Sequence, residues 1–201
     1  MARIYTRGGD RGQTSLGDGS RTAKSGPRVD LYGEVDELIS WIGHAGALLA
    51  EGTDGDPVCS AIGRDLVSIQ NRLFCLASVL ANPALSAQDT PAGAAHPAFD
   101  PAHLEQRIDE MDGRLPALTR FILPGGPPCV TVLQLARTVC RRVERKAVAL
   151  GEAETAAEAV PERGIIYLNR LSDYLFVAAR AVGHALGAPE RAWDQTEGAD
   201  D

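Results

Sequence analysis

An apolar stripe over residues 58–80 constrains the fold of this 201-residue chain more than any other feature. Its members are Val58, Ile62, Leu66, Ile69, Leu73, Leu76 and Leu80, each three or four residues from the next. That spacing places all of them on one face of an α-helix, so it predicts a helix over about 57–80 that buries one side.

Four further helices are expected from similar periodicity and from the proline and glycine residues that bound it. They span about 27–50, 100–111, 129–150 and 164–186. No convincing strand run is found, and residues 82–99 and 151–164 are expected to be a mobile loop and an acidic linker. We therefore predict an all-α, single-domain five-helix bundle. An N-terminal glycine-rich loop over 1–26 would precede the bundle over 27–190, and an acidic tail over 191–201 would follow it.

Charge and composition exclude several classes of function. The net charge of −7 argues against non-specific nucleic-acid binding, although cations concentrate at 3–28 and 137–146. Two basic patches in an acidic protein favour a small anionic ligand. The chain shows no apolar run of about 18 residues, no apolar leader and no CxxC among its four cysteines. A cytoplasmic location is expected.

The second basic patch lies on the helix expected over 129–150. At 100° per residue, one side carries Val132, Leu135, Val139, Val143 and Leu150, and the opposite side carries Arg137, Arg141, Glu144 and Arg145. Like charges four residues apart repel each other, and arginine suits bidentate contact with phosphate. The arginines therefore form either a solvated polar face or an anion site.

Two other helices carry polar groups with open interpretations. Asn169 and Asp173 are one turn apart, and Asp173 is either a surface partner of Arg170 or part of the same anion site. Asp36 and Glu37 are either acids that favour the helix dipole or partners of an arginine on another helix or another subunit.

Residues 5–28 read YTRGGDRGQTSLGDGSRTAKSGPR. Their composition fits either a disordered tail or a loop whose glycine-rich backbone and cations hold an anion. No GKS or GKT follows the glycines, and no strand–helix unit surrounds them, which excludes a Walker A motif and a Rossmann fingerprint. The four histidines share no metal-ligand spacing.

Four blocks, taken together, resemble one family. They are IYTRGGDRGQTSLGDGSRTAKSGPRVDLYGEVDELISWIG, FILPGG, ARTVCRRVER and YLNRLSDYLF, in this order along nearly the whole chain. In these blocks the chain resembles the PduO-type ATP:corrinoid adenosyltransferases.

The resemblance implies an enzyme that transfers the 5′-deoxyadenosyl group of ATP to the cobalt of cob(I)alamin, or a related reduced corrinoid, giving adenosylcobalamin and triphosphate. It implies a five-helix bundle assembled as a homotrimer with active sites between subunits. ATP with Mg²⁺ would be the co-substrate, and a reductase and a B12-dependent mutase would be partners. The alternatives are a non-catalytic corrinoid or nucleotide escort and a purely structural helical bundle.

The resemblance also assigns site residues. The nucleotide-binding set is Thr6, Arg7, Gly8, Gly9, Thr14, Ser15, Lys24, Arg141, Arg142, Val143, Glu144, Arg145 and Asn169. Within it Arg141 is expected to stabilise the leaving triphosphate, and Glu144 to help hold Mg²⁺ with the nucleotide. Asp173 is expected to orient the arginines.

Three further residues are expected, from the same resemblance, to act in catalysis. Asp36 would pair with Arg137 across the subunit boundary. Phe121 of FILPGG would pack beneath the corrin and displace its lower ligand. Removing that ligand eases reduction of Co(II) to Co(I), and Co(I) is a strong enough nucleophile to need no enzyme base.

Overall fold

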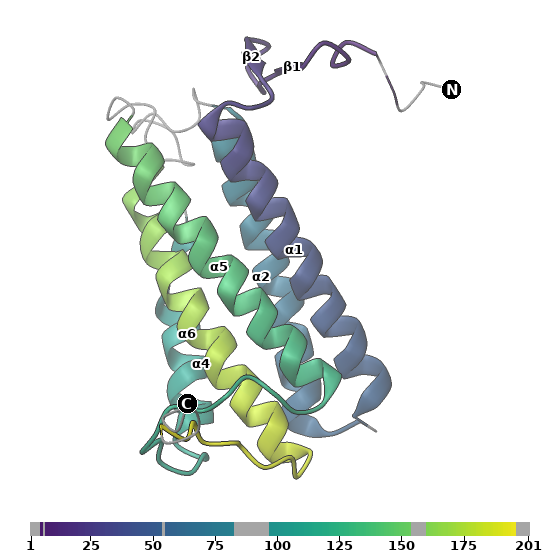
Figure 1. Ribbon diagram of the computed structural model, residues 1–201, viewed down its shortest axis with the longest axis vertical. Helices are drawn as coiled ribbons and strands as arrows, with labels where there is room; N and C mark the ends of the chain where they lie inside the picture. The colour runs from purple at the N-terminus through teal and green to yellow at the C-terminus, as the bar shows by residue number, and fades with distance from the viewer. Residues whose placement is uncertain (1–4, 6, 54, 83–96, 154–159, 196–201) are drawn as a thin grey trace, which may run out of the picture. The chain divides into compact units, whose positions relative to one another are not determined.

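The computed structural model describes residues 5, 7–53, 55–82, 97–153 and 160–195. Within these residues lie five α-helices, one 3₁₀ turn and a two-stranded sheet (Figure 1). The helices are α1 (Pro27–Gly52), α2 (Pro57–Ala81), α4 (Ala102–Asp112), α5 (Pro128–Ala153) and α6 (Glu162–Ala185). The predicted all-α class and each predicted helix are confirmed, with ends shifted by a few residues.

The chain folds into two compact units. Unit 1 comprises Met1–Ile39, Asn71–Asp100 and Val139–Asn169, and unit 2 comprises Ser40–Gln70, Pro101–Thr138 and Arg170–Asp201. Four helices, namely α1, α2, α5 and α6, contribute one part to each unit, whereas α4 belongs to unit 2 alone. The predicted boundaries after residues 26 and 190 stay predictions.

The core of unit 1 is formed by the apolar faces of its four helix segments. Its fully buried members include Val35, Leu38, Leu73, Leu76, Leu80, Cys140, Val143 and Leu168. At the start of α6, Gly164 allows close approach to α2, because a Cβ there would lie 3.3 Å from Leu76 Cδ1. The stripe predicted for α2 is buried from Ile62 onward, and Val58 is half-buried.

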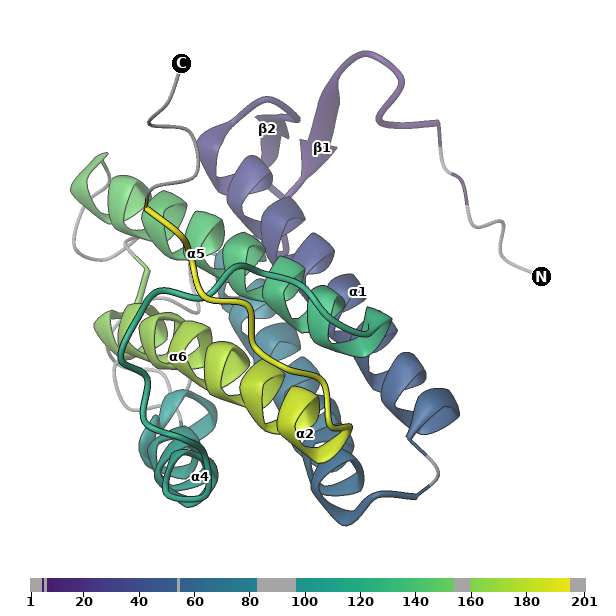
Figure 2. The same ribbon diagram turned by 60° about the horizontal axis from the view of Figure 1, so that its bottom comes forward.

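Unit 2 packs α4 against the parts of the longer helices that it contains. Its buried members include Ile42, Ile62, Leu66, Leu104, Met111, Leu133, Leu171, Leu175 and Val182. In Figure 2, α4 lies beside α6, and Arg170 of α6 donates a hydrogen bond to Glu105 of α4 at 2.9 Å. Asp65 of α2 accepts a hydrogen bond from the hydroxyl of Tyr174 of α6 at 2.9 Å, so this buried tyrosine has a partner for its polar group.

The apolar stripe predicted for α5 was wrong at Leu135. That side chain is 46% exposed, whereas Leu133, Ala136, Cys140 and Ala147 are buried. The buried face is therefore rotated toward a line of small side chains. Alanine and cysteine stand out less than leucine and valine in an apolar pattern, although they are often buried.

The expectation that the chain has no strand was also wrong. Strands β1 (Gln13–Ser15) and β2 (Arg21–Ala23) form an antiparallel hairpin that leads into α1 (Figure 1). Gly19 makes the turn with a φ of 85°, a conformation that glycine adopts without strain. Gly17 N donates to the carbonyl of Ala81 at the end of α2, at 2.6 Å, so the hairpin is anchored within unit 1.

Residues 83–96 of the loop predicted over 82–99, and residues 154–159 of the linker predicted over 151–164, lie outside the described residues. The 3₁₀ turn Pro97–Phe99 is described, and Phe99 within it is buried. None of the described helices combines the length and the apolar character that a bilayer-spanning segment needs.

Candidate functional site

One pair of cations on α5 is neutralised by acids of α1. Arg142 donates hydrogen bonds to Glu34 and Glu37, and Lys146 donates to Asp30 at 2.6 Å and to Glu34 at 2.7 Å. Burial alone would raise the pKa of Glu34, but the hydrogen bonds from Lys146 and Arg142 outweigh burial and lower it. The two cations therefore serve mainly to join α5 to α1.

A second pair of cations on the same helix, Arg141 and Arg145, is left available. Both side chains are exposed, and among the described residues neither forms a hydrogen bond or an ion pair. They stand one turn apart, where two like charges repel each other unless an anion lies between them. Of the predicted nucleotide residues, these two have the geometry and the free donors best suited to phosphate.

Glu144 and Asn169 lie together beside the two free arginines. Asn169 Nδ2 donates to Glu144 Oε1 at 2.9 Å, which links α6 to α5 within unit 1. Glu144 follows Arg141 by three residues, so the two side chains are neighbours on the helix surface. Arg141, Glu144, Arg145 and Asn169 therefore lie along one edge of unit 1, and their role in binding a nucleotide stays a prediction.

 Three arginines of the N-terminal segment line an open cavity of about 620 Å³ in the hairpin region. Its lining residues are Arg7, Gly8, Asp10, Arg11, Gln13 and Arg21. Arg21 donates to Gly8 O at 2.8 Å and to Ser15 Oγ at 3.2 Å, so it fixes the loop on the hairpin. The cavity therefore presents arginine charge together with glycine-rich backbone, a combination suited to an anion.

Arg7 and Lys24 add two specific features to this loop. Arg7 has a φ of 60°, which is uncommon for a residue other than glycine, and its guanidinium lies over the ring of Tyr5 at 5.6 Å. Lys24 N donates to Gly12 O at 2.9 Å. A Cβ at Gly9 would lie 3.0 Å from Lys24 Nζ, so glycine at this position lets the ammonium group lie against the loop.

The other residues predicted to bind the nucleotide lie in different surroundings. Thr14 and Ser15 lie in β1, opposite Thr22 and Arg21. Thr6 lies outside the described residues. Val143 is fully buried in the core of unit 1, so its side chain is not accessible to a nucleotide.

Arg137 and Asp173 belong to unit 2. Arg137 Nε donates to Gln134 Oε1 at 2.7 Å, and its guanidinium lies 5.9 Å from the centre of the Phe176 ring. Asp173 accepts from Arg170 at 2.8 Å, the surface pair that the spacing allowed. The predicted support of the nucleotide arginines by Asp173 stays a prediction.

The predicted pairing of Asp36 with Arg137 concerns two subunits, and the structure contains one chain. Asp36 is exposed on α1. The acid next to it, Glu37, accepts a hydrogen bond from an arginine of another helix, Arg142. The pairing of Asp36 across a subunit boundary stays a prediction.

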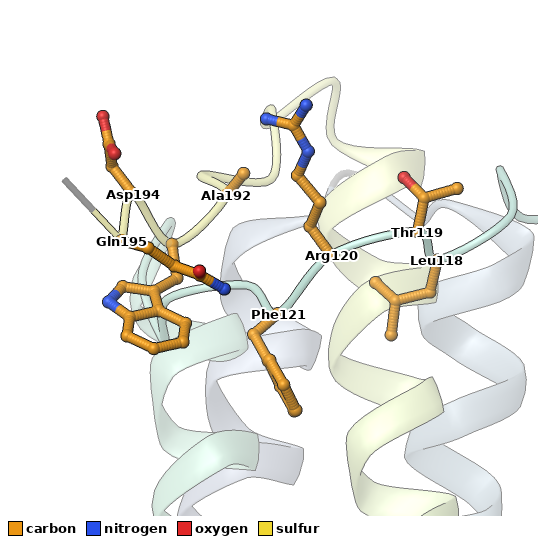
Figure 3. A pocket seen from close by; sticks show the side chains of 8 residues that line it. Leu118, Thr119, Arg120, Phe121, Ala192, Asp194 and Gln195 are labelled. Atoms are coloured by element: carbon orange, nitrogen blue, oxygen red, sulfur yellow. The ribbon is translucent and has the colours of Figure 1, made fainter.

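Phe121 lies on the extended segment ahead of α5 and is 76% exposed. Figure 3 shows it with Leu118 on that segment and with Asp194 and Gln195 on the facing C-terminal segment. These residues line an open cavity of about 840 Å³ in unit 2. The ring of Trp193 meets the Phe121 ring edge to face, with centroids 6.2 Å apart.

Two residues of these sites were missed from the sequence. Arg21 was counted only as one cation of a basic stretch, although it follows a GDG turn that brings it opposite Ser15. Trp193 was placed in an acidic tail. A tryptophan is an unusual residue for a solvated tail, and the chain has only two, so its identity was an available signal.

The donor groups fit a metal ion that arrives with a nucleotide. Within the described residues, no three His, Cys, Asp or Glu side chains gather in a way that could hold a metal ion. Glu144 is a single, half-exposed carboxylate beside the free arginines. Mg²⁺ is commonly held by one or two carboxylates together with the phosphates of a substrate, so one carboxylate is sufficient here.

Comparison with known proteins supports one family. The family model described as cobalamin adenosyltransferase matches residues 4–182. The corrinoid adenosyltransferase of Bacillus subtilis is 42% identical over 185 residues, which are 92% of this chain and 89% of that protein. The corrinoid adenosyltransferase of Bos taurus is 39% identical over 98% of this chain and 78% of its own length.

Solved structures give the same result. A variant of the PduO-type ATP:corrinoid adenosyltransferase from Lactobacillus reuteri, complexed with cobalamin and ATP, has a TM-score of 0.81 and 34% identity. The match covers 96% of this chain and 100% of that one. Another variant of the same protein, complexed with ATP, has a TM-score of 0.80 and 36% identity, with 95% and 100% covered. The chain belongs to the cobalamin adenosyltransferase family.

Proposed function

We propose that the protein transfers the 5′-deoxyadenosyl group of ATP to the cobalt of cob(I)alamin or a related reduced corrinoid. The cobalt supplies an electron pair to C5′ of ATP, so a Co–C bond forms. The C5′–O bond breaks, and its electron pair leaves on triphosphate. The products are adenosylcobalamin and triphosphate, and no proton transfer to or from the protein is required.

The observation that carries this proposal is the free pair Arg141 and Arg145 beside Glu144 and Asn169. Negative charge develops on the leaving triphosphate, and preorganised cations lower the barrier when they are aimed at such charge. Arg141 stabilises the leaving group, and Asn169 donates a hydrogen bond to the nucleotide. Arg142 adds positive charge beside Arg141 while its side chain stays bound to Glu34.

The N-terminal hairpin forms the other part of the proposed nucleotide site. Arg7, Gly8, Gly9 and Lys24 contact ATP, together with Thr6, Thr14 and Ser15. The cavity lined by Arg7, Arg11 and Arg21 supports this role, because it gathers positive charge around backbone that glycine keeps open. Mg²⁺, when bound through Glu144, offsets part of the charge of the triphosphate.

Phe121 acts in the proposal at the corrin rather than at the nucleotide. Its exposed ring provides an apolar wall that displaces the lower ligand of Co(II). Reduction to Co(I) then needs one electron from an external reductant, which a reductase supplies in the proposed cycle. A B12-dependent mutase is the proposed consumer of the product.

We further propose a homotrimer with active sites between subunits, in which Asp36 pairs with Arg137 of a neighbour. Sedimentation equilibrium is expected to give three times the 21.3 kDa of one chain. Asp36→Ala is expected to shift the protein toward smaller species. A wild-type protein that sediments as a monomer would exclude this assembly and leave the transfer reaction to be tested separately.

The direct test of the activity mixes the protein with MgATP and chemically reduced cobalamin under anaerobic conditions. The visible spectrum is expected to become that of adenosylcobalamin, with one triphosphate released for each cobalt alkylated. Corrinoid binding without triphosphate release would indicate an escort instead. An unchanged spectrum and no effect of ATP on the melting temperature would leave a structural bundle.

A further inference from the structure

Arg180 of α6 is an almost completely buried cation in unit 2. It is 4% exposed, and its side chain reaches acceptors in three other places. Nε donates to Glu190 Oε1 at 2.7 Å and Nη2 to the other oxygen of that carboxylate at 3.4 Å. Nη2 also donates to Pro116 O at 2.8 Å, and Nη1 to Asp112 Oδ1 at 3.4 Å.

Asp112 ends α4, and the other two acceptor residues belong to the segments that carry Phe121 and Trp193. Pro116 lies five residues before Phe121, and Glu190 lies three residues before Trp193. Beyond Arg180, the segments are joined by an antiparallel bridge between Ile122 and Ala192. Leu123 N donates to Arg191 O at 2.8 Å, and Trp193 N donates to Phe121 O at 2.7 Å.

Phe121 has little else to hold it. The ring is 76% exposed, so core packing does not fix its direction. Within the described residues, the ring contacts one other aromatic ring, that of Trp193, edge to face. Trp193 is itself 48% exposed. The placement of the Phe121 ring therefore depends on how firmly the two segments are joined.

We infer that Arg180 and Glu190 are positioning residues that hold the Phe121 segment against the Trp193 segment and so set the place of the Phe121 ring. The inference rests on the proposed function, in which that ring acts on Co(II). The guanidinium is suited to this task, because its rigid fork can serve a bidentate carboxylate and a carbonyl at the same time. A lysine offers one point charge and cannot reproduce this arrangement.

Stability alone gives little reason to bury this charge. A buried ion pair costs desolvation energy, and an apolar replacement of similar volume is often as stable or more so. An arginine that joins one helix to two otherwise lightly held segments supplies fixed geometry, which an apolar side chain does not.

The test uses Glu190→Gln in the full-length protein. Glu190 lies beyond the end of α6 and is about one-third exposed, so the fold should tolerate the change. Adenosylcobalamin formation is measured twice, once from cob(I)alamin and once from Co(II) with a one-electron chemical reductant. The spectrum of protein-bound Co(II) with ATP reports the fraction that has lost its lower ligand.

The matched control is Glu110→Gln. Glu110 also accepts a hydrogen bond from an arginine in unit 2, Arg107, but it has no described contact with the Phe121 or Trp193 segments. Arg180→Lys is the second variant, since it keeps the charge and removes the fork.

We expect Glu190→Gln to lower the Co(II)-started rate about tenfold while the Co(I)-started rate stays within about twofold. The fraction of Co(II) without its lower ligand should fall in parallel, and Arg180→Lys should behave in the same way. Equal changes in both rates, no change in either, or the same loss in Glu110→Gln would overturn the inference. A wild-type protein inactive from cob(I)alamin would instead overturn the proposed function.

Discussion

Arg142 of α5 donates a hydrogen bond through Nε to Glu34 of α1, and this contact gives Arg142 a different role from that of its neighbour Arg141. Arg142 is held by acids, whereas its neighbour Arg141 is exposed and has no described partner. One arginine therefore contributes mainly to the packing of α5 against α1. The other keeps its donors for a ligand.

The two arginines should respond differently to removal. Arg141→Ala is expected to lower kcat by about 10²-fold with little change in melting temperature, because it removes one donor to the leaving triphosphate. Arg142→Ala is expected to cost up to about 1 kcal/mol of unfolding free energy, because it leaves Glu34 and Glu37 without this partner. Initial rates and thermal unfolding measure both effects. A fully active Arg141→Ala protein would contradict the assignment.

Stability should depend on the ionisation of Glu34. The folded pKa of this carboxyl lies below its ordinary value of 4.5 because of the hydrogen bonds from Lys146 and Arg142, which outweigh burial. The stabilisation is therefore present above the unfolded pKa and is lost as the pH falls through the lower folded pKa. Urea unfolding of the wild type and Glu34→Gln should differ most near neutral pH and converge in acid. Glu51→Gln, on the exposed end of α1, is the control. A pH-independent difference would argue against the linkage.

The helices could be predicted because their apolar stripes are long. The residues of α2 that recur every three or four positions can be buried only on one helical face, and from Ile62 onward they are buried. The separation of Arg141 from Arg142 could not be predicted in this way. It depends on acids of α1 that are more than 100 residues away in sequence, and periodicity within α5 carries no information about them.

The short elements were harder to predict for a different reason. The strands Gln13–Ser15 and Arg21–Ala23 are too short and too polar to show apolar alternation. Trp193 reaches Phe121 through a single bridge between two irregular segments, and no local pattern encodes such a pairing. The family blocks named Phe121, but they did not indicate what holds it.

Phe121→Ala is expected to separate the two starting states of the corrinoid. Activity from Co(II) should fall at least about tenfold, because the apolar wall that displaces the lower ligand is removed. Activity from Co(I) should persist, and stability should change by less than about 0.5 kcal/mol because the ring is exposed. Val148→Ala, an exposed apolar residue of α5 in unit 1, is the control. Unimpaired activity of Phe121→Ala from Co(II) would remove the proposed role.

Lys24 should act in nucleotide binding rather than in folding. Its ammonium group lies against Gly9 in the hairpin, and its side chain is exposed. Lys24→Ala is therefore expected to raise KM for MgATP about tenfold, with a melting temperature close to that of the wild type. Ser25→Ala, at the exposed neighbouring position, should leave KM unchanged.

Hydrogen exchange provides an independent measurement on the same hairpin. Backbone amides of residues 7–24 should become protected when MgATP is added, because the glycine-rich backbone closes on the phosphates. The added protection should be smaller in Lys24→Ala at equal ATP concentration. Amides that exchange equally fast with and without MgATP, in a protein that still forms adenosylcobalamin, would show that the hairpin does not hold the nucleotide.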